Sequence, residues 1–80
     1  MSVSTSVRMA LAKGNKKQTE LAEMLGFQRQ AVNLKLAKER WTGAELARIA
    51  EFTGGKLAFI YPDGQQILID PPEDDEPPEK

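Results

Sequence analysis

The chain has 80 residues, no cysteine, no histidine and a formal net charge of −1. This length allows one domain at most, and the lack of cysteine excludes a disulfide framework. Residues 1–69 offer no plausible paired carboxylates, and the chain has no phosphate-binding glycine loop and no acids at metal-ligand spacing, so we expect no enzyme activity, no metal site and no cofactor.

The charge is unevenly distributed along the chain. Residues 70–80, "DPPEDDEPPEK", hold six acids and one lysine, a net charge of −5, which leaves +4 for residues 1–69. A proline-rich acidic segment without other apolar side chains cannot offset its ordering entropy, so residues 70–80 are predicted to be a disordered tail behind an ordered domain of residues 1–69. No apolar run approaches the ~18 residues of a membrane span, and no signal-peptide core follows the start, so we expect a cytoplasmic protein that does not contact a membrane.

The first predicted helix covers about residues 4–13. Val7, Ala10 and Leu11 recur at the three- and four-residue spacing of one helix face, and Gly14 with Asn15 is a stop signal. The candidate N-caps are three consecutive hydroxyl residues, Ser4, Thr5 and Ser6.

Two further helices are predicted in quick succession. Residues 18–25, "QTELAEML", place Leu21, Ala22 and Leu25 on one face, and Ala22 is small where a neighbouring helix must come close. Only Gly26 and Phe27 precede the third helix, whose inner stripe is formed by Ala31, Val32 and Leu36. Two helices joined by so short a turn cross steeply, which is the geometry of a helix-turn-helix.

The fourth helix carries the clearest start signal. Thr42 followed by Glu45 is a capping box, and Gly54-Gly55 ends the segment. Its inner face is formed by Leu46, Ile49 and Ala50. We expect Trp41 to pack at the helix junction and the core to include Leu21, Leu25, Val32, Leu46 and Ile49.

A β-hairpin is predicted at residues 57–69. Apolar runs at 57–61 and 67–69 flank the turn sequence Pro62-Asp63-Gly64. A lone hairpin is barely stable in water, so one face should pack on the helices and the other face or a free edge should pair with a second chain. The predicted dimerisation residues are Leu57, Phe59, Ile60, Tyr61, Ile67 and Ile69.

Long polar side chains gather at the start of the third helix and are expected to project outward. Gln and Asn can bond adenine bidentately, and Arg can do the same to guanine, in the major groove of double-stranded DNA. The candidate base contacts are Gln28, Arg29, Gln30, Asn33 and Leu34, of which Leu34 either touches a thymine methyl or is a tolerated apolar residue. The candidate phosphate contacts are Lys16, Lys17 and Gln18 at the start of the second helix, with Lys35, Lys38 and Arg40 along the third. The competing interpretation is an ordinary solvated polar surface.

The stretch "QTELAEMLGFQRQAVNLKL" resembles the helix-turn-helix of the Cro/CI-type, lambda-repressor-like family of phage and bacterial regulators. The matching positions are Gln18, Leu21-Ala22, Gly26 and Val32. The resemblance implies a mainly α fold, namely a four-helix lambda-repressor-like domain followed by a C-terminal β-hairpin, and a third helix that reads bases. The hairpin also resembles the strands through which some Cro proteins dimerise. The chain departs from the pattern at Gln28, where the family usually has a Ser or Thr cap, and at Leu34, a position that is often polar.

These features lead us to expect a homodimeric transcriptional regulator, a repressor that occludes polymerase from a two-fold operator with half-sites ~34 Å apart. One alternative is the antitoxin of a toxin–antitoxin pair, whose tail would fold onto the toxin, although the tail lacks apolar anchors. A second is a protein-interaction module that binds by strand addition at the hairpin edge and not to DNA. The acidic tail is expected to be a solubilising terminus or, alternatively, a tether that competes with DNA for the basic face.

Overall fold

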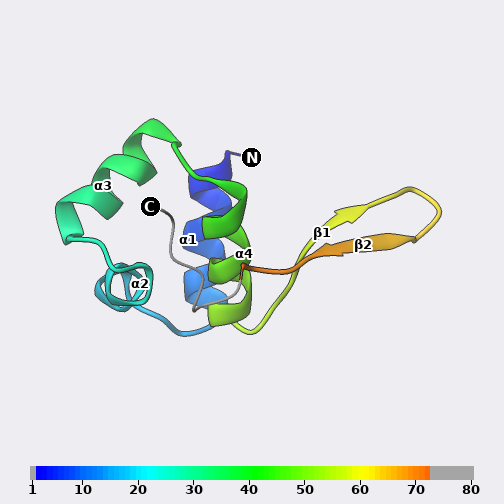
Figure 1. Cartoon of the computed structure of the whole chain (residues 1–80), viewed down its shortest axis with the longest axis horizontal. Coiled ribbons are helices and arrows are strands. Elements are labelled where there is room, and N and C mark those ends of the chain that lie inside the picture. Colours follow the sequence, from blue (N-terminus) through cyan, green and yellow to red (C-terminus); the bar gives the residue numbers. More distant parts are fainter. Residues whose placement is uncertain (1, 73–80) are drawn as a thin grey trace.

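A computed structural model describes residues 2–72 of the chain, as four helices followed by two antiparallel strands (Figure 1). The elements are α1 (Val3–Lys13), α2 (Gln18–Leu25), α3 (Arg29–Lys38), α4 (Gly43–Phe52), β1 (Leu57–Ile60) and β2 (Gln66–Ile69). The mainly helical architecture with a terminal hairpin is confirmed, and within the described part no helix is long and apolar enough to cross a membrane. Most of the predicted tail, from residue 73 onward, lies outside the described residues.

The first helix starts earlier than the sequence predicted. Its N-cap is Ser2, whose hydroxyl accepts a hydrogen bond from the Thr5 N–H at 3.1 Å, so the predicted caps at Ser4, Thr5 and Ser6 are wrong. Each of these hydroxyl residues could cap a helix as judged from its neighbours in the sequence. Only the tertiary packing determines which serine or threonine is the cap. Ser4 is instead turned into the body, where 2% of it is exposed.

The bounds predicted for the second helix are confirmed, and the turn that follows it is tight. Gly26 adopts a φ of 76°, in the left-handed region that glycine tolerates, and the Phe27 N–H returns to the Ala22 carbonyl at 2.9 Å. Gln28 then precedes α3 as its N-cap and makes no side-chain capping bond. The chain therefore reverses out of α2 and enters α3 within three residues.

The core lies where the four helices meet. Its buried residues come from all of them, and Leu21 and Val32 at the centre have 0% exposure. The predicted core positions Leu25 and Leu46 are only partly buried and pack against the cluster, and the predicted packing role of Trp41 is confirmed. The remaining buried apolar residues are Val7, Leu11, Ala22, Leu36, Ala47 and Ile49.

The hairpin extends from the helical body as an arm (Figure 1). The strands pair with Leu57 opposite Ile69 and Phe59 opposite Ile67. The predicted turn is confirmed: the Gly64 N–H bonds the Tyr61 carbonyl at 2.9 Å, with a Gly64 φ of 92°. Leu57, at the base of the arm, lines a groove between α1 and α4, so β1 begins in contact with the helices.

Candidate nucleic-acid interface

The beginning of α3 presents a cluster of exposed polar side chains. Gln28, Arg29, Gln30 and Asn33 are all exposed and together line one shallow hollow on the surface. On the opposite side of the same helix, Val32 and Leu36 are buried in the core. The core thus sets the rotation of α3, and four of the five side chains predicted to contact bases face outward together.

Leu34 belongs to a different part of the surface. Its side chain is 56% exposed, and it lines a second hollow with Lys35, Lys38 and Arg40. Lys38 and Arg40 are exposed as well. The structure therefore separates the predicted α3 residues into a polar group at its start and a basic group toward its end.

The start of α2 is tied to the polar group of α3. The side-chain amide of Gln18 donates a hydrogen bond to the Oδ1 atom of Asn33. Gln18 is the first residue of α2, and Asn33 lies in the middle of α3. The bond therefore links α2 to α3. It joins Gln18, a predicted phosphate contact, directly to Asn33, a predicted base contact.

The lysines that precede α2 differ in their surroundings. The Lys16 ammonium lies 4.8 Å from the centroid of the Phe52 ring, a cation–π contact that holds this side chain against α4. Lys17 is exposed, and its backbone N–H donates to the Glu20 carboxylate at 2.7 Å. Because Glu20 already occupies this N–H, an anion here would be held chiefly by the lysine ammonium groups.

Lys35 was predicted to contact phosphate, but its ammonium is bonded to other parts of the protein. Its ammonium forms a 3.0 Å ion pair with Glu45 and donates to the Arg40 carbonyl at 3.1 Å, and its side chain is 22% exposed. The same ammonium lies 5.2 Å and 5.8 Å from the ring centroids of Phe27 and Trp41. With its donors used in this way, Lys35 ties α3 to α4 and does not join the exposed basic group.

A buried hydrogen-bonding pair that the sequence did not reveal holds the other end of α3. The Ser4 hydroxyl donates to the Leu36 carbonyl at 2.6 Å and accepts from the Trp41 indole N–H at 3.3 Å. Nearby, the Val3 N–H donates to the Glu39 carboxylate at 3.1 Å. A serine in a first helical turn usually indicates capping, so no local signal distinguished this role.

The predicted dimerisation residues divide into two groups. Phe59, Ile60, Tyr61 and Ile67 are exposed, and Ile60 reaches 71%. Leu57 and Ile69 are partly buried at the base of the arm. Leu68, which the prediction omitted, is also exposed and lies opposite Ala58, so apolar side chains cover both faces of the hairpin.

Among the described residues, no group of three or more His, Cys, Asp or Glu side chains is placed to hold a metal ion. The candidate interface around α2 and α3 presents hydrogen-bonding side chains together with ammonium and guanidinium groups. Such groups suit a ligand rich in acceptors and negative charge. Comparisons of the chain with protein-family models, curated protein sequences and solved structures found no match.

Proposed function

We propose that this protein is a sequence-specific DNA-binding transcriptional regulator of the Cro/CI type, in which α2, the turn at Gly26 and α3 act as a helix-turn-helix. The observation that carries the proposal is the exposed cluster of Gln28, Arg29 and Gln30 at the start of α3, opposite a face that is fully committed to the core. A major groove about 12 Å wide admits one helix, and these side-chain types are the ones that pair bidentately with purine edges.

The residues around the cluster support the same orientation. Lys17 and Gln18 stand at the start of α2, joined to α3 through the bond from Gln18 to Asn33. Lys38 and Arg40 supply positive charge toward the other end of α3. Phosphate contacts on both sides of a base-reading segment fix the register of a protein on the duplex, so this spacing suits DNA better than a small anion.

The proposal includes a homodimer formed through the hairpin. The hairpin of a monomer exposes the apolar side chains of Phe59, Ile60 and Ile67 to water. Contiguous exposed apolar surface of this kind is typical of an interaction site. Pairing of two arms would cover these side chains and relate two copies of α3 by a two-fold axis, as a repressor on a palindromic operator requires.

The test is selection of bound sequences from random DNA, followed by gel shifts with two matched variants. Arg29→Ala should lose ~1–3 kcal/mol of binding free energy for the selected operator and relax base preference at one position in each half-site. The control is Arg8→Ala, which removes the same exposed side chain type from α1 and should leave the affinity unchanged. Equal affinity of the Arg29→Ala variant and the wild type, or a selection without two-fold symmetry, would refute the assignment.

A further inference from the structure

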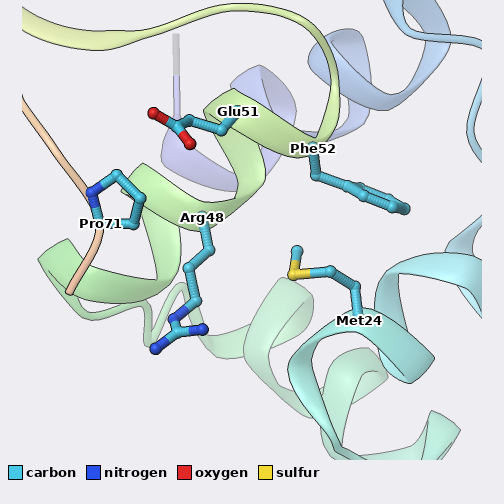
Figure 2. Close-up of a pocket in the computed structure, with 5 residues that line it drawn as sticks. All are labelled: Met24, Arg48, Glu51, Phe52 and Pro71. Atoms are coloured by element: carbon cyan, nitrogen blue, oxygen red, sulfur yellow. The ribbon is translucent and has the colours of Figure 1, made fainter. Parts of the chain in front are cut away.

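The end of the described chain returns from the hairpin to the helical body. Pro71 lines a pocket with Met24 of α2 and with Arg48, Glu51 and Phe52 of α4 (Figure 2). Pro71 is partly buried there, whereas the hairpin turn is fully exposed. The pocket therefore holds the end of the described chain, directly before the acidic residues 73–76 in the sequence.

This pocket adjoins the lysines at the start of α2. Phe52, one of its walls, carries the Lys16 ammonium 4.8 Å from its ring centroid, and Lys17 follows directly. The Phe52 ring thus contacts both the pocket that holds Pro71 and Lys16, the first candidate phosphate contact. The end of the described chain and the start of α2 are therefore close in space, although 54 residues lie between Lys17 and Pro72 in the sequence.

The local charge favours an acidic segment at this place. Among the described residues that line the pocket, Glu51 is the one acid, and it is paired with Lys56 at 2.8 Å. The hydrogen bond and the charge of Glu51 raise the pKa of Lys56 above its ordinary value, so the Lys56 ammonium remains protonated at neutral pH. With Glu51 paired in this way, Lys16 and Lys17 supply positive charge beside the pocket.

The segment that follows has the charge and length to reach them. Residues 73–80 hold five acids and one lysine, a net charge of −4. Any eight-residue stretch in the polyproline II conformation, at about 3.1 Å per residue, spans roughly 25 Å. The two shorter dimensions of the molecule are 29 and 23 Å. Lys16, whose ammonium lies against the Phe52 wall of the pocket that holds Pro71, is therefore closer to the end of the described chain than the length of this segment.

We propose that residues 73–79 occupy the basic surface at Lys16 and Lys17 in the DNA-free protein and compete there with DNA phosphates. The inference rests on the proposed function and adds regulation of the same surface. Each exposed ion pair is weak, but the tether supplies the acids at an effective concentration in the millimolar range. The segment competes for phosphate contacts and leaves the base contacts unaffected. It therefore lowers the affinity for operator and for random DNA by the same factor.

The test compares the full chain with a variant in which all five acids are converted to amides, and with a chain ending at Pro72. Both variants should bind operator and random duplex about five- to tenfold more tightly at about 50 mM salt, and less than about twofold more tightly at about 300 mM, where the Debye length is shorter. A second readout needs no DNA: amide chemical shifts of the full chain and the amide variant should differ at Lys16, Lys17 and their neighbours. Arg8 on α1 and Asp63 in the hairpin turn are the internal controls.

Shift differences spread evenly over Arg8, Asp63 and the start of α2 would overturn the docked segment, because a general charge effect has no preferred site. Unchanged affinity of both variants for random DNA at about 50 mM salt would overturn the competition. If shifts localise at α2 while no form of the protein binds any DNA, the proposed function fails and the intramolecular contact stands.

Discussion

Replacing Ser4 by alanine should destabilise the helical body, because the hydroxyl connects three parts of it. The Ser4 Oγ atom donates to the Leu36 carbonyl at 2.6 Å and accepts from the Trp41 indole at 3.3 Å. Leu36 lies in the last turn of α3, where carbonyls have no partner within the helix. The alanine variant therefore leaves one carbonyl and one indole N–H without their hydrogen bonds.

The two lost bonds differ in their effect on the free energy of unfolding. A buried polar group left without a partner costs about 1–3 kcal/mol. The short bond to Leu36 belongs to a site where Ser4 is 2% exposed, whereas Trp41 is only partly buried and water can replace the longer bond. We therefore expect a loss of about 2 kcal/mol, near the middle of the range for one buried group. In a domain of this size that loss lowers Tm by roughly 8–16 °C.

Urea unfolding followed by circular dichroism measures this loss, at one fixed protein concentration because a dimer would make the transition concentration-dependent. The matched control is Ser6→Ala on the exposed side of α1, which should change the free energy of unfolding by less than about 0.5 kcal/mol. Trp41→Phe, combined with Ser4→Ala, completes a double-mutant cycle for the longer bond. If the Ser4→Ala and Ser6→Ala variants unfold at the same urea concentration, the hydroxyl does not hold α3.

Three further substitutions test other parts of the structure. Gly14→Ala would place a Cβ atom 2.8 Å from the Thr53 Cα atom, so calorimetry should show a destabilisation of about 1–3 kcal/mol, and an unchanged Tm would contradict the close approach. Lys17→Ala should weaken binding to all DNA sequences alike and reduce the salt slope by about 1 in titrations across salt concentrations, whereas a sequence-dependent loss would argue for a base contact. Ile60→Lys should produce monomers in sedimentation experiments without lowering the helix content, while Met9→Lys on α1 should not; equal sedimentation of the two variants would exclude the hairpin as the dimer contact.

Local signals in the sequence were sufficient for much of the fold. Gly26 ends α2 in the left-handed region, which glycine enters at the lowest cost, and the predicted bounds of α2 are confirmed. The capping box of Thr42 and Glu45 likewise marks the start of α4, with the Glu45 N–H bonded to the Thr42 hydroxyl at 3.1 Å. Such signals depend on neighbours in the chain, so they can be recognised without knowledge of the packing.

The parts that were not predicted depend on contacts between distant segments. Ser4 is buried because α3 passes over it, and Lys35 turns inward because Glu45 and two aromatic rings surround its ammonium. Leu25 is only partly buried, whereas the smaller Ala22 is buried. Of the candidate site, the outward face of α3 followed from the buried face, whereas the separation of Leu34 from the polar cluster required the structure.

The exposed positions at the start of α3 have a consequence for how this protein could diverge. Gln28, Arg29 and Gln30 contribute no side chain to the core, and α3 is held from behind by Val32 and Leu36 and near its end by Ser4. A library that randomises these three codons should consist largely of folded members. Under the proposed function, target preference could then drift through successive substitutions while thermal stability stayed constant, because the side chains proposed to contact bases are not those that form the core.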